Sequence, residues 1–294
     1  MARITHQELL DAGVHFGHLK RKWNPKMAPY IFMEKNGIHL IDLNKTAVKM
    51  EEAASALKQV AKSGKKILFV ATKKQAKEIV ATEAKRLNMP YITERWPGGM
   101  LTNFATVRKS IKKMGNFERM ATDGTFETIS KKERLQINRQ KGKLQKLLGS
   151  ISDLSRLPAA IFIVDIMKEH IAVSEAQKLN IPTFGMVDTN SDPSTVDFPI
   201  PANDDASSSV ALTLKVIGTA IEEGLSERKA EKEVDKDVAQ VTEGEDEETS
   251  GENNIDGLGG EEDVSIIAAG KKLKAEKPET HLARTKKPRK SLKK

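Results

Sequence analysis

The chain has 294 residues, of which 38% are hydrophobic and 31% are charged, and its formal net charge is +8. It contains no cysteine, which excludes disulfide bonds and thiolate metal sites. The longest apolar run, residues 159–164, is too short to cross a bilayer, so we expect a soluble cytoplasmic protein with no membrane partner. The basic balance favours a polyanionic partner, although ordinary surface lysine would give the same composition.

The predicted elements alternate between strands and helices along most of the chain. Thr5 and Glu8 form a capping-box pattern that, with Gly13 beyond it, predicts a short N-terminal helix. Strands are predicted at residues 37–43, 66–72, 90–93, 160–165 and 183–188, and helices at residues 45–62, 74–87, 167–179 and 206–229. This alternation predicts an α/β fold with a parallel sheet covered by helices on both faces.

Residues 103–154 interrupt the alternation because they contain no strand pattern. Two helical patterns flank a turn at residues 122–128, and the second begins at the capping box of Ser130 and Glu133. Apolar residues recur at spacings of three, four and seven, namely Phe104, Val107, Ile111 and Met114, then Ile137, Leu144, Leu148, Ile151 and Leu154. Such a narrow seam is typical of a helix paired with one other helix, so we expect an inserted, projecting antiparallel coiled-coil hairpin.

The predicted hairpin is strongly basic. Residues 104–146 contain 12 Lys and Arg against 4 Asp and Glu. Many of these cations lie off the apolar seam, including Arg108, Lys109, Lys112, Lys113, Lys131, Lys132, Arg139 and Lys143. A solvated coiled coil also carries charge on its outer positions, but it mixes the two signs. The excess of cations therefore favours docking along the phosphate backbone of a nucleic acid.

A second basic cluster lies near the N-terminus, within residues 13–33. Arg21, Lys22 and Lys26 are interleaved with aromatic residues that include Trp23. Such a segment can bind phosphates with its cations and stack its aromatic rings on bases or riboses. The alternative is a packed loop in which Trp23 and Phe16 belong to the core and only the cations are exposed.

A third cluster, residues 95–100 (RWPGGM), immediately precedes the predicted hairpin. Arg95 supplies a cation, Pro97 stiffens the chain, and Gly98 and Gly99 permit positive φ and a close approach of another group. Either RNA or the base of the hairpin itself could occupy the space beside these glycines.

The residues expected of a nucleotide-binding enzyme are missing. A dinucleotide-binding sheet has a glycine-rich turn after its first strand, whereas Asn44-Lys45-Thr46 and Lys73-Lys74-Gln75 follow the first two predicted strands. Four aspartates, Asp165, Asp188, Asp192 and Asp197, follow predicted strand ends, where ligands of such sheets bind. They are equally suitable turn residues, so we expect no catalytic residue, no cofactor and no small-molecule substrate.

The histidines give no metal-site pattern. His15 and His18 stand three residues apart, but no acidic residue nearby in the sequence completes a set of ligands. We therefore expect structural roles for both and no metal site.

The C-terminal part differs in composition from the rest. Residues 226–264 contain 15 acids and 4 bases, whereas residues 265–294 contain 11 bases and 2 acids. From about residue 236 to residue 294 there are almost no aromatic residues and no apolar periodicity, so this segment cannot bury enough surface to offset its ordering entropy. We predict a folded body at residues 1–225, with the hairpin inserted at 103–154, and a disordered tail at 226–294.

Several long segments resemble the bacterial small-subunit ribosomal protein S2 family. They are residues 12–46, residues 95–111 (RWPGGMLTNFATVRKSI), residues 158–182 with Glu175, and residues 187–206 (VDTNSDPSTVDFPIPANDDA). The resemblance spans roughly residues 1–225 in consistent order. The acidic-then-basic tail departs from the short tails of many members.

The resemblance implies a flavodoxin-like three-layer sheet with an inserted coiled-coil hairpin. It also implies a place on the solvent side of the small ribosomal subunit, between head and body, in contact with 16S ribosomal RNA and neighbouring proteins. Members of the family help to recruit the largest small-subunit protein, the multi-OB-fold protein that captures messenger RNA. The hairpin and the segment around Arg21, Lys22 and Trp23 match family elements that face RNA or partners.

We therefore expect a structural RNA-binding constituent of the small subunit that acts in translation. The predicted RNA-binding residues are Arg21, Lys22, Trp23, Lys26, Arg95, Arg108, Lys109, Lys112, Lys113, Lys131, Lys132, Arg139 and Lys143. Two other hypotheses are an enzyme on the same fold, which the missing glycine-rich turns disfavour, and an RNA-binding regulator outside the ribosome.

Overall fold

The computed structural model describes the backbone of residues 4–123 and 130–248, and the side chains of these residues apart from Ala121 and residues 232–248. Most of the predicted hairpin turn and residues 249–294 of the predicted tail lie outside the described residues. The predicted domain boundaries therefore stay predictions.

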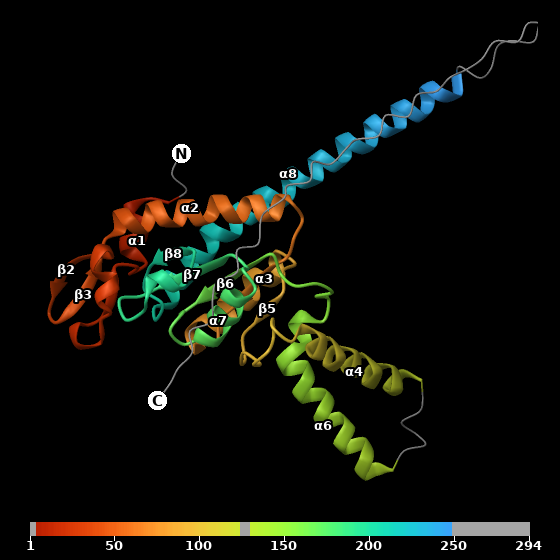
Figure 1. Ribbon diagram of the computed structural model, residues 1–294, viewed down its shortest axis with the longest axis horizontal. Coiled ribbons are helices and arrows are strands. Elements are labelled where there is room, and N and C mark those ends of the chain that lie inside the picture. Colours follow the sequence, from red (N-terminus) through yellow and green to blue (C-terminus); the bar gives the residue numbers. More distant parts are fainter. Residues whose placement is uncertain (1–3, 124–129, 249–294) are drawn as a thin grey trace, which may run out of the picture. The chain divides into compact units, whose positions relative to one another are not determined.

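The centre of the fold is a five-stranded sheet whose strands are ordered β5-β4-β6-β7-β8 (Figure 1). The strands are β4 (Ile67–Val70), β5 (Tyr91–Ile92), β6 (Ala160–Val164), β7 (Thr183–Val187) and β8 (Phe198–Pro201). Every neighbouring pair is parallel. The α/β class and the four predicted strands β4 to β7 are thus confirmed.

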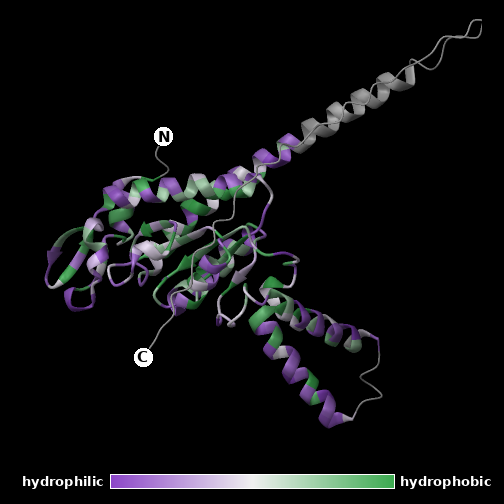
Figure 2. Cartoon of the chain, in the orientation of Figure 1, coloured by the Kyte–Doolittle hydropathy of each residue, from purple (hydrophilic) through white to green (hydrophobic). Residues whose placement is uncertain are grey.

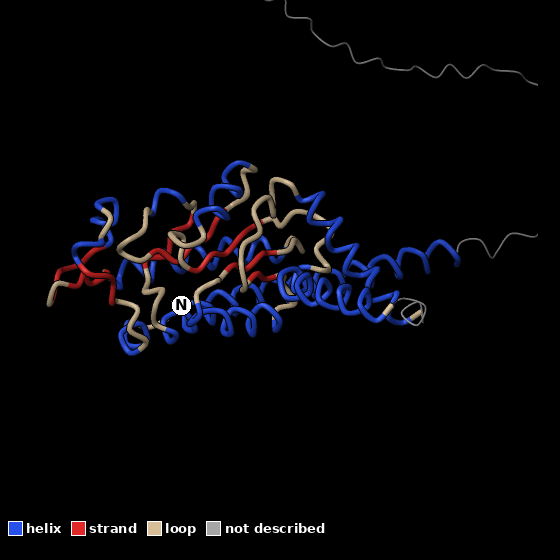
Figure 3. The backbone as a smooth tube through the Cα atoms, turned by 90° about the horizontal axis from the view of Figure 1, so that it is seen from below, coloured by secondary structure: helices blue, strands red, loops and turns tan. Residues whose placement is uncertain are grey.

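Helices cover both faces of this sheet, as Figure 3 shows with the strands between blue helices. The helices are α2 (Leu43–Lys62), α3 (Lys74–Arg86), α7 (His170–Lys178) and α8 (Ser207–Glu248). Successive strand residues point to opposite faces, so Phe69 packs with α2, α3 and α8, while Leu68 and Val70 pack with α7. Every residue of β4 and β6 is buried, and both strands are continuous apolar runs, which are largely green in Figure 2.

A second, antiparallel sheet precedes the parallel one. It is ordered β1-β3-β2 and consists of β1 (Phe16–Leu19), β2 (Ile31–Lys35) and β3 (Ile38–Ile41). The strand predicted at residues 37–43 is therefore real, but its assignment to the parallel sheet is wrong. Asn36 and Gly37 both have positive φ, which makes them the two-residue turn of a β-hairpin between β2 and β3.

The helix α1 (His6–Asp11) begins as predicted. The Thr5 hydroxyl accepts a hydrogen bond from the Glu8 backbone, and the Glu8 carboxylate accepts one from the Thr5 backbone N–H at 2.8 Å. This reciprocal pair satisfies two N–H groups that the first turn of a helix leaves without partners.

Two helices, α4 (Phe104–Thr122) and α6 (Lys131–Leu148), occupy the stretch without strands (Figure 1). They contact each other, and an ion pair joins Lys141 to Glu118 across the contact at 3.7 Å. The second helix ends earlier than predicted, because the 3-10 turn η3 (Gly149–Ile151) follows it. Ile151 and Leu154 are consequently part of the core beside the sheet and not of the seam between the helices.

The last helix, α8, is longer than predicted. The helix predicted from the sequence ended near residue 229, yet the helical backbone continues to Glu248. Residues 226–248 are rich in Glu, Lys, Ala and Gln, which favour helix. Within residues 4–123 and 130–248, no helix is long and apolar enough to cross a membrane.

Candidate RNA-binding surfaces and a buried polar cluster

Every predicted RNA-binding side chain is exposed in the structure. The side chains fall into three groups: residues 21–26 after β1, Arg95 before α4, and the eight cations of α4 and α6. The fold brings none of these groups into one pocket, so they form separate surfaces.

The N-terminal group lies in two short 3-10 helices, η1 (Lys20–Lys22) and η2 (Pro25–Tyr30). Between them, Trp23 packs against His39 with ring centroids 5.1 Å apart and remains 36% exposed. Phe16 is 49% exposed. The alternative that placed these two aromatics in the core is therefore wrong. Of the two, Trp23 directly follows Arg21 and Lys22 in the chain.

Lys26 differs from the other cations of this group because it already has an acidic partner. Its ammonium lies 2.5 Å from an Asp192 carboxylate oxygen and donates a hydrogen bond to Ser194 at 3.1 Å. Burial disfavours the ionised form of Asp192, but the hydrogen bonds from Lys26 and Ser194 outweigh it and lower the pKa of the carboxyl group. We expect Lys26 to contribute less to RNA binding than Arg21 and Lys22.

The loop at residues 95–102 is organised around one buried carboxylate, Glu175 of α7. One oxygen of Glu175 accepts hydrogen bonds from the Trp96 indole at 3.1 Å and from the Gly99 backbone N–H at 2.8 Å. The other accepts from the backbone N–H groups of Leu101 at 2.9 Å and Thr102 at 3.2 Å. A Cβ at Gly99 would lie 3.3 Å from the Cβ of Asn103 just before α4, whereas one at Gly98 would meet nothing within 4 Å, so the base of the hairpin fills the space beside Gly99 alone.

Two charged residues, Glu94 and Arg95, lie where this loop begins. Arg95 points to solvent, whereas its neighbour Glu94 lies 3.4 Å from both Lys77 of α3 and Lys146 of α6. The pair with Lys146 links the end of α6 to the body.

The cations of α4 and α6 lie on the outer faces of the two helices, which are largely purple in Figure 2. On α4, Arg108 with Lys112 and Lys109 with Lys113 are spaced four apart, so they form two adjacent rows. On α6, the residues of the set are Lys131, Lys132, Arg139 and Lys143. Within the described part of the chain, none of these eight cations forms an ion pair with a carboxylate.

A buried polar cluster lies at the carboxyl edge of the parallel sheet. Lys73, which follows β4, places its ammonium 3.0 Å from Asp165 after β6, 2.7 Å from Asp204, and 2.9 Å from Asp205. His18 of β1 lies beside them: its Nδ1 is 3.0 Å from Asp188 Oδ2 and its Nε2 is 3.3 Å from Asp205 Oδ2.

Burial and crowding shift the pKa values of this cluster. Burial, together with the like charges of Asp188 and Asp165, raises the pKa of Asp204 to about 7. Burial opposes the charged form of Lys73, but its hydrogen bonds to Asp204 and Asp205 outweigh this and raise the Lys73 pKa. The direct interaction with Asp188 raises the pKa of the His18 imidazole.

The sequence predicted only part of this cluster. Of the four aspartates expected after strand ends, Asp165 and Asp188 belong to the cluster. The other two do not: Asp192 pairs with Lys26, and Asp197 accepts hydrogen bonds from Thr183. His18, Lys73, Asp204 and Asp205 were missed as a group. The sequence contained a signal for Lys73, because this residue directly follows a predicted strand. It contained none for His18, which reaches the cluster from the antiparallel sheet.

Comparison with known proteins identifies the family. The sequence profile described as ribosomal protein S2 matches residues 9–224. Proteins named small ribosomal subunit protein uS2 are similar to this chain. The one from Flavobacterium johnsoniae is 68% identical over 233 residues, covering 79% of this chain and 92% of the relative. The one from Cytophaga hutchinsonii is 68% identical over 231 residues, covering 79% and 91%. The one from Bacteroides thetaiotaomicron is 64% identical over 239 residues, covering 81% and 86%. The chain therefore belongs to the ribosomal protein S2 family.

Proposed function

We propose that this protein binds 16S ribosomal RNA, between the head and body of the small subunit, through two basic surfaces. The first is the outer face of α4 and α6, and the second is the segment at residues 20–26. The observation that carries the proposal is the exposure of eight cations on α4 and α6 without acidic partners among the described residues. Cations arranged in this way bind phosphates and release counterions.

The coarser function follows from the family. The chain is a structural constituent of the small ribosomal subunit in the cytoplasm, it acts in translation, and it is not an enzyme. This membership disfavours both alternatives from the sequence, the nucleotide-binding enzyme and the free RNA-binding regulator.

The test of RNA binding neutralises the two rows on α4. We expect the variant R108Q/K109Q/K112Q/K113Q to bind small subunits depleted of this protein more weakly than the unmodified chain. Each lost phosphate contact should flatten the slope of log K against log salt by about one unit. Sedimentation of labelled protein with depleted subunits at several salt concentrations measures both quantities.

The matched control is K65Q/K74Q/K85Q/K178Q. These four lysines are also exposed, but they lie on the body away from the proposed surfaces. Because it removes the same charge, the control should keep most of the affinity and the salt slope. Equal loss in both variants would mean that net charge, and not the face of α4, accounts for the binding.

We also propose that the antiparallel sheet is a surface for protein partners, among them the largest, multi-OB-fold protein of the small subunit. Phe32 is 72% exposed and Met33 47% exposed on β2, at one edge of this sheet. Phe16 and Leu19 of β1, at the other edge, are 49% and 42% exposed. Exposed apolar side chains on one small sheet favour a protein partner over RNA.

Reconstituted subunits test the protein partner. The variant F32D/M33D should give subunits that contain less of the largest protein, as measured by quantitative mass spectrometry. L179D, at a residue 37% exposed near the end of α7, is the control. Normal content of the largest protein in the F32D/M33D subunits would rule out this surface.

A further inference from the structure

The buried polar cluster has an unbalanced charge and carboxylate oxygens without partners. Three carboxylates, Asp165, Asp204 and Asp205, contact the ammonium of Lys73, and a fourth, Asp188, lies beside the imidazole of His18. Asp188 is 1% exposed and Asp204 is fully buried, so water cannot compensate their charge. Charged carboxylates in such an environment are unfavourable unless a proton or a further cation neutralises them.

Each of the two buried aspartates accepts hydrogen bonds through Oδ1, whereas its Oδ2 accepts none from the described residues. Asp188 Oδ1 accepts hydrogen bonds from the Thr189 backbone at 2.5 Å and from its hydroxyl at 3.1 Å. Asp204 Oδ1 accepts from Lys73 at 2.7 Å. The Oδ2 atoms of both are buried without a hydrogen-bond partner among the described residues, and the one on Asp188 is near His18 Nδ1 but not aligned with it.

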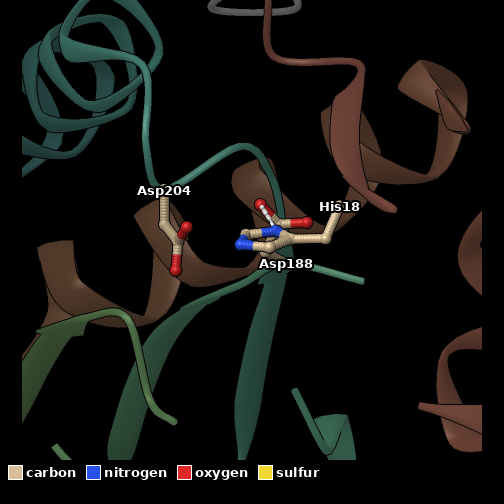
Figure 4. A group of neighbouring side chains, drawn as sticks. All are labelled: His18, Asp188 and Asp204. Carbon is tan, nitrogen blue, oxygen red and sulfur yellow. Dashed lines mark ion pairs between the residues drawn. The ribbon is translucent and has the colours of Figure 1, made fainter. Parts of the chain in front are cut away.

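The imidazole of His18 lies between these two carboxylates, as Figure 4 shows. One ligand atom from each of His18, Asp188 and Asp204 can be chosen so that all three lie within 4.8 Å of one another. From these positions we propose that His18, Asp188 and Asp204 bind a divalent transition-metal ion of the zinc type, with Asp205 at the solvent side.

The donor set distinguishes among cations. Magnesium and calcium prefer oxygen ligands, whereas an imidazole nitrogen together with carboxylate oxygens suits zinc. Ligand atoms on a tetrahedral zinc ion, with bonds of about 2.0–2.2 Å, lie about 3.4 Å apart, so the three side chains must draw together on binding. Asp205 is 53% exposed and His18 is 19% exposed, which gives the ion a path from solvent.

Neighbouring residues hold His18 in this position. The His18 backbone N–H donates to the Thr189 hydroxyl at 2.8 Å, directly beside Asp188. Gly17 permits this approach, since a Cβ there would lie 2.5 Å from Thr189 Cγ2 and 3.0 Å from the His39 carbonyl oxygen. The ion would therefore tie β1, and with it the basic segment at residues 20–26, to the edge of the parallel sheet.

The experiment is a zinc titration of the purified full-length protein after treatment with a chelator. We expect binding by isothermal titration calorimetry that millimolar magnesium does not displace. In D204N and H18Q the affinity of this site should fall by at least about 100-fold, as expected for the loss of a metal ligand. H15Q is the matched control, because His15 lies three residues from His18 but outside the cluster.

X-ray absorption on the zinc-loaded unmodified protein provides a second measurement that does not depend on the variants folding. It should show nitrogen and oxygen neighbours at about 2.0–2.2 Å with the scattering of one imidazole. No zinc binding, equal binding by D204N, H18Q and the unmodified chain, a preference for magnesium, or a zinc ion without imidazole would each overturn the proposal. Lys73 alone, or an ordered water, would then satisfy the buried carboxylates.

Discussion

At the scale of single residues, Glu175 holds the loop before α4 in place, although it does not belong to the predicted RNA surface. It is 6% exposed and accepts hydrogen bonds from the loop that leads into α4. Its burial alone would raise the carboxyl pKa, but the hydrogen bonds from Leu101, Trp96, Thr102 and Gly99 prevail and lower it. The charged form is thus the one that the fold stabilises.

We predict that Glu175→Gln lowers the free energy of unfolding by about 2–3 kcal/mol at neutral pH, because an amide keeps one acceptor where the carboxylate has two. A depressed folded-state pKa means that this stabilisation is present above the unfolded pKa, about 4.3, and is lost as the pH falls through the folded value. The difference between E175Q and the unmodified chain should therefore shrink below about pH 4.

Urea denaturation of both proteins between neutral and acidic pH measures this difference. Glu133→Gln is the control, since Glu133 is an exposed carboxylate at the start of α6. If the free energies of unfolding of E175Q and the unmodified chain differed by the same amount at all pH values, the packing of the Glu175 side chain, and not its charge, would account for its role.

At the scale of elements, the residues that follow α6 differ from the helix pair α4 and α6 in where they are buried. The helices α4 and α6 bury only part of their seam, with Met114 and Phe117 the buried side chains of α4. The residues just after α6 belong instead to the core: Ile151 is fully buried and packs in the cluster that covers one face of the sheet. The apolar spacing of α6 continues through Ile151 and Leu154, so the sequence pattern could not show where the helix ends and the core begins.

We predict that Ile151→Asp destabilises the whole body, and not the hairpin alone, by about 3–5 kcal/mol, because it buries a charge without a partner. Thermal unfolding followed by circular dichroism should show one transition at a lower temperature. Leu135→Asp is the control on α6, where the side chain is 52% exposed. Loss of α4 and α6 alone, with an unchanged main transition, would contradict this placement.

The missed strand β8 shows a second effect at this scale. Its sequence, Phe198-Pro199-Ile200-Pro201, contains two prolines, which cannot donate to a ladder. The strand pairs only with β7 and lies at the edge of the sheet, where prolines are tolerated because one side of the strand needs no partner. The segment can form a strand because it lies at the edge of the sheet, and its position in the sheet cannot be predicted from the local sequence.

At the scale of the whole molecule, charge is distributed unevenly along the chain. Residues 226–264 are acidic and residues 265–294 are basic. An acidic segment is repelled by RNA, whereas the basic end, with Lys286, Lys287, Arg289 and Lys290 close together, is attracted to it.

We predict that truncation after Val264 weakens the binding of depleted small subunits and flattens its salt dependence, because cations that contact RNA or an acidic protein are lost. Truncation after Leu225 should give a similar loss, and it also removes the ion pairs of Lys58 with Glu227 and of Lys62 with Glu231. Competitive reconstitution against the full chain measures the effect. Equal incorporation of all three chains would show that the two charged blocks serve solubility or neutralise each other.

The sequence by itself determined the family, the α/β class, the central strands and helices and the exposed cations, because these depend on local periodicity, on capping and on long contiguous motifs. Only the tertiary structure decided which residues meet at the carboxyl edge of the sheet. His18, Lys73, Asp188 and Asp204 stand far apart in the chain, and they converge because parallel strands end at one edge and a glycine lets the second sheet approach it. Contacts of this kind depend on how the elements pack, which no local pattern of residues contains.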